Sequence, residues 1–112
     1  MRILEEEIKK ADLANANNLL NGEMVKAVVD VEKEIVGIDA EMHADIEQML
    51  LEKGSNQDAL WGINLWFNDP EEDFIEFDSM INIRPRQGNR SRDVEDAVTR
   101  EKIKAIVAKW IK

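Results

Sequence analysis

In three segments of the chain the apolar residues have the spacing that is typical of the buried face of an α-helix. A repeat of three to four positions places these residues on one side of each segment, and charged residues fill the other side. Glycine follows the first two segments and aspartate precedes the third, as is typical of helix ends. The predicted helices are residues 4 to 20, residues 40 to 53, and a C-terminal stretch with N-cap Asp96 and the apolar stripe Ile103, Ile106, Val107, Trp110 and Ile111.

Between these segments the apolar and polar residues alternate, which is typical of β-strands. The valine-rich residues 24 to 38 are divided by Glu32-Lys33-Glu34, and this polar break predicts a hairpin. Residues 60 to 67, "LWGINLWF", and residues 74 to 84, "FIEFDSMINIR", alternate in the same way. The acidic loop "NDPEED" joins them, so we expect a second hairpin.

The apolar faces of the second hairpin predict its register, because a slip of one residue would turn every side chain to the other face. Consecutive hairpins favour an α+β domain, with a four-stranded antiparallel sheet of two hairpins, helices packed on one face, and the order α-β-β-α-β-β-α. Trp66 and Met80 fall on the polar face, which suggests that a helix, a second subunit or a ligand covers it. The predicted pairs are Leu65 with Phe77, Phe67 with Ile75, and Trp61 with Ile81; the other face then sets Trp66 beside Glu76, Asn64 beside Asp78 and Asp58 beside Arg84.

Composition narrows the class of protein. The chain has 112 residues, which predicts a single domain over residues 1–112. It has no cysteine, so disulfides and thiolate metal sites are excluded. No apolar run is long enough for a membrane helix, and we expect a soluble cytoplasmic protein with no membrane partner. A net charge of −9 argues against general nucleic-acid binding.

Several stretches together resemble a known protein family. They are "MVKAVVDVEK", "HADIEQMLLEKGS", "LWGIN", "IEFDSMINIRPRQGNRSR" and "REKI", and they cover most of the chain from Met24 onward. The chain is similar to a family of short bacterial proteins catalogued as a domain of unknown function. This resemblance implies a compact standalone protein and brings no activity, cofactor or site residue with it.

Four of the six arginines lie within nine positions, Arg84 to Arg92, a segment that we call the arginine loop. Gly88-Asn89 is a turn signal that can expose backbone N–H groups, and Ser91 adds a hydroxyl. Guanidinium groups match phosphate geometry because they offer planar pairs of donors. We therefore interpret Arg86, Arg90, Arg92, Asn89 and Ser91 as binding residues for a phosphate-bearing ligand or an acidic protein partner. Arg84 lies at the end of the predicted strand, where Pro85 holds it extended and the predicted register places it beside Asp58, so we expect Arg84 to have a structural role.

The arginines have two other interpretations. Residues 54 to 78 hold seven acids and no base, and three acids follow the arginine loop directly. The arginines could pair with these carboxylates within one chain or between subunits of a homodimer, or they could be solvated. The loop lacks the spacing of a P-loop or of GxGxxG, and we predict no cofactor.

An acid–base enzyme is the alternative function. Glu76 and Asp78 point to one side of their predicted strand, and His43 is the one histidine of the chain. Paired carboxylates beside a tryptophan could carry general acid–base chemistry on an anionic substrate. Asp39, His43 and Glu47 share a helix face, but three such ligands are weak grounds for a metal site, and we predict none. The sequence favours a binding module and leaves catalysis uncertain.

Overall fold

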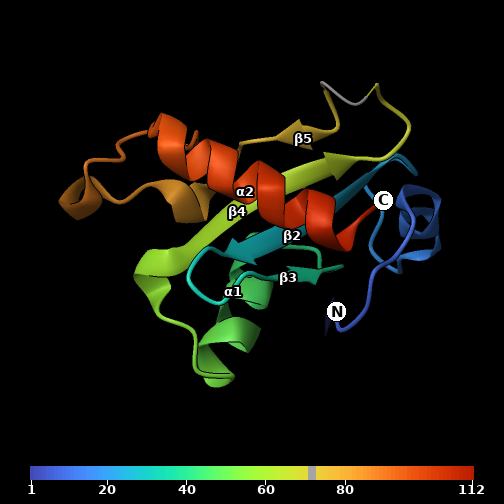
Figure 1. Ribbon diagram of the computed structural model, residues 1–112, viewed down its shortest axis with the longest axis horizontal. Coiled ribbons are helices and arrows are strands. Elements are labelled where there is room, and N and C mark those ends of the chain that lie inside the picture. Colours follow the sequence, from blue (N-terminus) through green and yellow to red (C-terminus); the bar gives the residue numbers. More distant parts are fainter. Residues whose placement is uncertain (71–72) are drawn as a thin grey trace.

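In the computed structural model, which describes residues 1–70 and 73–112, five antiparallel strands form one sheet in the order β1-β3-β2-β4-β5 (Figure 1). Strands β2 and β3 are the predicted first hairpin, and β4 pairs with β2 along its whole length. The sheet thus has one strand more than predicted, because the start of the chain adds β1. The strands are β1 (Arg2–Ile3), β2 (Met24–Asp30), β3 (Ile35–Ile38), β4 (Leu60–Trp66) and β5 (Ile75–Glu76).

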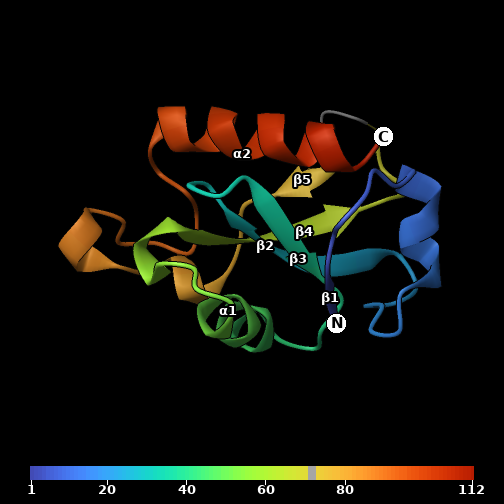
Figure 2. The ribbon, with the colours of Figure 1, turned by 60° about the horizontal axis from the view of Figure 1, so that its bottom comes forward.

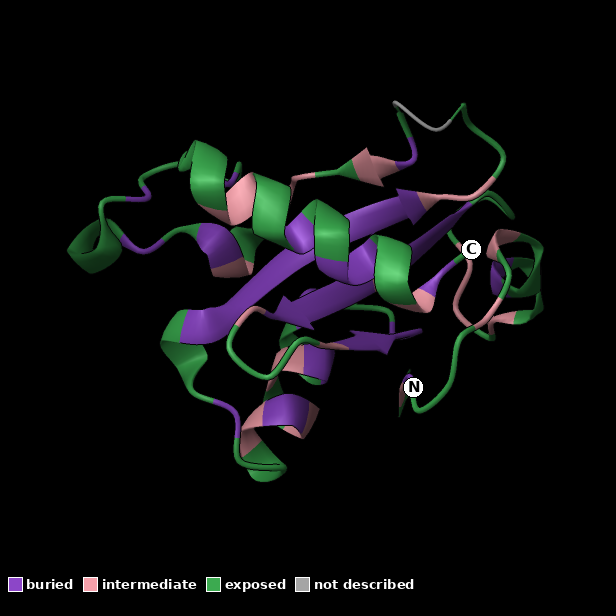
Figure 3. Ribbon diagram, in the orientation of Figure 1, coloured by how far each residue is buried: buried purple, intermediate pink, exposed green. Residues whose placement is uncertain are grey.

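Two α-helices lie on opposite faces of the sheet, so the prediction of helices on one face is wrong (Figure 2). Alternate residues of β2 face α1 (His43–Glu52) and α2 (Ala97–Trp110). Val28 packs with Ile46 and Leu50 of α1, whereas the odd-numbered residues of β2 pack with α2. Figure 3 shows the central strands buried along their length, as expected for a sheet covered on both sides.

Two glycines permit close approach to the side of the sheet that α1 covers. A Cβ atom on Gly37 would lie 2.7 Å from Cγ2 of Ile46, so this glycine lets α1 rest against β3. A Cβ atom on Gly62 would lie 2.5 Å from Oγ of Ser79 and 2.6 Å from its Cβ. The chain that follows β5 can therefore cross directly over β4.

The predicted helix over residues 4 to 20 is wrong. Between β1 and β2 the chain has bends, turns and isolated bridges, and its helical part is the 3-10 helix η1 (Lys10–Asn15). Ile8 forms a parallel bridge with Ile111, in which Ile8 N–H donates to the Trp110 carbonyl at 2.8 Å. Asparagine-rich residues 15 to 18 have low helix propensity, and burial of Leu13 in the core outweighs the weak helical pattern.

The second hairpin forms with a register two residues away from the predicted one. Leu65 pairs with Ile75 and Asn64 with Glu76. A shift by two residues keeps each side chain on its predicted face, because the period of a strand is two. Residues 71–72 of the predicted acidic loop lie outside the described residues.

Strand β5 ends much earlier than predicted. Ser79 accepts a hydrogen bond from Ile81 N–H at 3.3 Å and caps the 3-10 helix η4 (Met80–Asn82). Ile81 consequently packs with the apolar residues under α1 and not with Trp61, its predicted partner, which packs on the α2 side, and Ile83 is exposed. Neither α-helix among the described residues has the length and apolar character needed to cross a bilayer.

Candidate functional site

The arginine loop projects from one end of the molecule, where the 3-10 helix η5 (Pro85–Gln87) forms its tip (Figure 1). Buried Asn89 holds the base of the loop. Its side-chain amide donates to the carbonyls of Asn82 and Asp93 at 2.7 Å each, and its Oδ1 accepts from Glu95 N–H at 2.8 Å. Asn89, predicted as a binding residue, thus directs its polar atoms into the protein, and the role of Asn82 at the base of the loop was not predicted from the sequence.

Arg84 is part of the folded scaffold, with 7% of its surface exposed. Its guanidinium donates to the Leu60 carbonyl and lies 3.8 Å from the Glu47 carboxylate and 4.8 Å from the centre of the Trp61 ring. Burial lowers the pKa of Arg84, and the charge of Glu47 acts against that change. The expected structural role is thus supported by contacts other than the predicted neighbour Asp58, which pairs with Arg86.

The other three arginines carry exposed guanidinium groups. Arg86 pairs with Asp58, and Arg92 Nε lies 2.6 Å from Oδ1 of Asp78. Exposed pairs of this kind contribute about 0–1 kcal/mol and exchange readily with other partners. Within the described part of the chain, no carboxylate contacts the guanidinium of Arg90 closely enough to form a salt bridge.

Glu95 occupies the anion position formed by the turn after Asn89. One carboxylate oxygen accepts from the backbone N–H groups of Arg90 and Ser91 at 2.9 Å each, and from the Ser91 hydroxyl at 2.7 Å. The Ser91 hydroxyl contributes most to lowering the pKa of Glu95, and the backbone N–H groups add to that effect. The donors that the sequence suggested for a phosphate are therefore already used by a side chain four residues beyond Ser91.

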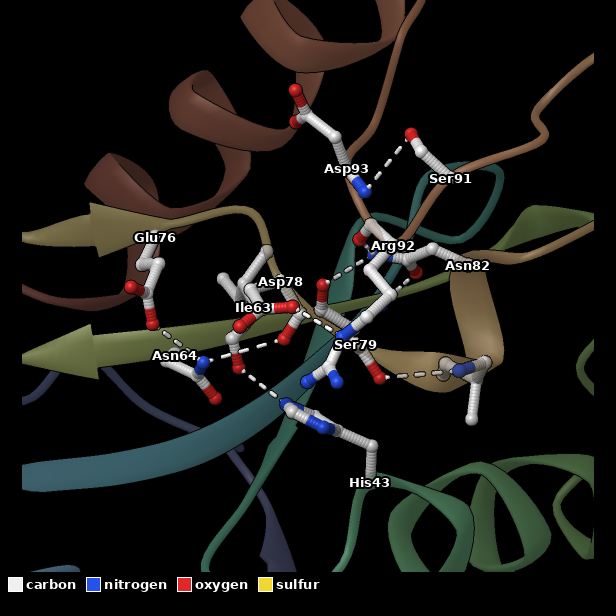
Figure 4. Close-up of polar contacts among 12 residues, drawn as sticks. His43, Ile63, Asn64, Glu76, Asp78, Ser79, Asn82, Ser91, Arg92 and Asp93 are labelled. Carbon is white, nitrogen blue, oxygen red and sulfur yellow. Dashed lines mark hydrogen bonds and ion pairs between the residues drawn. The ribbon is translucent and has the colours of Figure 1, made fainter.

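The candidate acid–base residues do not form one catalytic group (Figure 4). The His43 ring nitrogen Nε2 donates to the Ile63 carbonyl at 2.8 Å, and burial lowers the pKa of the imidazole. Glu76 accepts from the amide of Asn64 at 2.8 Å, whereas Asp78 faces Arg92. Among the described residues, neither carboxylate hydrogen-bonds to His43, and this arrangement does not favour the enzyme alternative.

Asn64 is the polar residue of this region that sequence reasoning missed as a site component. Its amide nitrogen donates to Glu76 and to the Asp78 carbonyl, while its buried Oδ1 has no hydrogen-bond partner in the part of the chain described. Trp66 donates from Nε1 to Glu76 at 3.2 Å and is partly buried, whereas Met80, which was predicted to be covered with it, is exposed.

The three residues considered as metal ligands each contact a different part of the protein. Asp39 accepts from the backbone N–H groups of Asn17 and Asn18 at 3.0 and 2.8 Å. Glu47 faces Arg84, and His43 is engaged with a backbone carbonyl. Residues 1–70 and 73–112 contain no group of three or more potential ligands placed to hold a metal ion.

An open hollow of about 450 Å³ lies between α1 and the start of the arginine loop. Its surface combines the buried Arg84 and the exposed Arg86 with apolar side chains, of which Met80 is 65% exposed. A charged rim beside exposed apolar groups is typical of surfaces that contact a partner. The hollow is lined by Glu47, Gln57, Met80, Ile81, Ile83, Arg84, Pro85 and Arg86.

The fold defines the molecule as a small α+β protein whose antiparallel sheet is covered on both faces and carries an arginine-bearing loop at one end. A family model described as "Protein of unknown function (DUF5674)" matches residues 2–110, and the chain belongs to this family. No curated protein and no solved structure matches the chain.

Proposed function

We propose that this protein is an interaction module that binds an acidic segment of a partner protein through Arg86, Arg90 and Arg92. The observation that supports it is that some residues of the arginine loop are buried anchors and others are exposed. Arg84 and Asn89 are buried and anchor the loop, while the other three guanidinium groups are exposed along it. A firmly anchored base beneath these exposed guanidinium groups reduces the conformational entropy lost when a partner binds.

An acidic peptide fits this surface better than a phosphate group does. The turn N–H groups and the Ser91 hydroxyl already hold Glu95, so a phosphate would meet guanidinium groups alone. The hollow beside Arg86 offers Met80 and Ile83 as an apolar floor. We therefore expect the bound segment to place an apolar side chain in the hollow and carboxylates against the arginines.

The net charge of the protein limits the strength and range of this binding. At −9, the molecule repels an acidic partner at long range. Charges separated by more than about 8 Å are screened at physiological salt, so the arginines can still attract carboxylates on contact. Binding should be weak, reversible and sensitive to added salt.

The test is a titration with a labelled, glutamate-rich synthetic peptide that has leucine at its centre, followed by fluorescence anisotropy. The test variant is R86Q/R90Q/R92Q. The matched control is K33Q/K53Q/K102Q, which removes the same charge from exposed lysines outside the loop. Inorganic phosphate, nucleotides and short RNAs form a second ligand series.

Saturable peptide binding by the wild type and the lysine control, with loss in the arginine variant, would support the proposal. Equal loss in both variants would show that net charge matters and the loop does not. Binding of phosphate compounds without binding of the peptide would replace the acidic segment with a phosphate ligand. No binding in either series would remove the interaction function from this loop.

A further inference from the structure

A second cavity, of about 330 Å³, lies between the C-terminal half of α2, strand β5 and the start of η1. It shares no lining residue with the hollow at the arginine loop. Its volume falls within the range of pockets that hold small molecules. Its lining consists of Lys10, Phe74, Ile75, Lys104, Val107, Ala108, Ile111 and Lys112.

The side chains that line this cavity carry positive charge, whereas the chain as a whole is negatively charged. The chain has 24 acidic residues and 15 basic ones, yet the cavity is lined by three lysines. Among the described residues, none of those lining it carries a carboxylate side chain. The five other lining residues are apolar, so the cavity combines a hydrocarbon surface with three positive charges.

The lysines differ in how firmly they are held. Lys10 donates from Nζ to the Asp69 carbonyl at 2.8 Å and lies 4.4 Å from the centre of the Phe74 ring. Within residues 1–70 and 73–112, the salt-bridge partner of Lys104 is the exposed Glu101 at 3.5 Å, and exposed pairs are weak. Lysine side chains keep their stems on apolar surface while the ammonium group stays at the rim, where it can meet an anion.

We propose that this cavity binds a small amphipathic anion, namely a carboxylate carried on an apolar chain or ring. The apolar part packs against Val107, Ala108 and Phe74, and the carboxylate lies between the ammonium groups of Lys104 and Lys112. Neither feature alone distinguishes this cavity, but the two together select a ligand with both an apolar body and a negative end. The site is independent of the interaction function proposed for the arginine loop.

The test compares decanoate with decanol, which has the same chain without the charge, below the concentrations at which either aggregates. Binding is followed by backbone amide shifts in two-dimensional NMR, which also locates the ligand. K104Q/K112Q removes the charge, and K102Q is the control on the exposed side of the same helix. A108F fills the cavity from its rim and tests the apolar part separately.

We expect saturable shifts at β5 and at the end of α2 with decanoate, and weaker binding of decanol. K104Q/K112Q should weaken decanoate binding about fivefold or more, while K102Q should bind as the wild type does. Shifts centred on the arginine loop, equal binding of the two ligands, or unchanged binding by K104Q/K112Q would each overturn the proposal. If A108F does not fold, the charge variant and the ligand pair still decide the question.

Discussion

The buried side chain of Asn82 forms two hydrogen bonds with the backbone of Gly62, as a neighbouring β-strand would. Gly62 N–H donates to Oδ1 of Asn82 at 2.8 Å, and Nδ2 of Asn82 donates to the Gly62 carbonyl at 2.9 Å. The same amide nitrogen donates to the Arg92 carbonyl at 3.0 Å. One side chain thus continues the sheet past the end of β5 and fixes the start of the segment that carries the arginine loop.

Replacement of Asn82 with leucine should strongly destabilise the protein. Leucine keeps most of the volume but leaves the buried N–H and carbonyl of Gly62 without partners, at about 1–3 kcal/mol for each group, and the Arg92 carbonyl keeps only its hydrogen bond from Ser79 N–H. We expect the free energy of unfolding in urea to fall by about 3 kcal/mol or more. Asn68→Leu, the same change at an exposed position, should cost less than about 0.5 kcal/mol. A loss below about 1 kcal/mol at Asn82 would show that water replaces the amide.

Two arginines of the same loop should differ sharply in their effect on stability. Arg84→Ala leaves the Glu47 carboxylate and the Leu60 carbonyl without their buried partner and should cost about 3 kcal/mol. Arg90→Ala, at an exposed position, should change the free energy of unfolding by less than about 0.5 kcal/mol. Chemical denaturation of both variants measures this difference. Similar losses would mean that the loop is stabilised as a unit.

The crossing of Ser79 over Gly62 predicts a rescue by a second substitution. Gly62→Ala places a Cβ atom 2.5 Å from Oγ of Ser79, and such overpacking typically costs about 1–3 kcal/mol. Ser79→Gly removes the opposing atoms, so the double variant should be more stable than the sum of the two single losses predicts. A double-mutant cycle measures the coupling. Additive losses would show that the backbone moves apart instead.

Glu95 should contribute to the pH dependence of stability. Its pKa is lowered from 4.5 in the folded protein, so the folded state binds fewer protons than the unfolded state near that pH. The contribution of Glu95 is therefore present above the unfolded pKa and is lost as the pH falls through the lower folded value.

In the variant Glu95→Gln this contribution is absent at every pH, because glutamine does not titrate. The stability difference between wild type and Glu95→Gln should shrink as the pH is lowered from about 6 to about 3. Thermal or urea unfolding across this range measures it, and Glu6→Gln controls for the removal of an exposed carboxylate elsewhere. A difference that stays constant with pH would show that the turn does not prefer the charged form.

The sequence pattern predicts the helix and strands of residues 24 to 66 well because the apolar residues of each element follow the regular spacing of that type of structure. The hairpin, α1 and β4 all lie close to their predicted bounds. The placement of helices on two faces was readable from "MVKAVVD", since a nearly continuous apolar run indicates burial on both sides. The alternation after Glu76 is misleading because the Asn82 side chain replaces strand pairing there, and this depends on a contact 20 residues away.

The candidate site was less predictable than the fold. Composition alone locates the arginine loop, and Gly88 at a φ of 80° confirms its predicted turn. The partners of the loop are set by tertiary structure: Arg86 meets a residue 28 positions away and Arg92 one that is 14 away. Asn82 and Asn89 look like surface turn residues, yet both are buried because they satisfy backbone groups.

The two outer strands of the sheet, β1 and β5, are each two residues long. A long free strand would offer a row of unpaired amides and carbonyls on which another chain could grow as an additional strand. Strands this short give such an intruding chain little backbone to pair with, which protects the sheet against cross-β aggregation. Any partner that this protein recognises should therefore meet its side chains rather than extend its sheet.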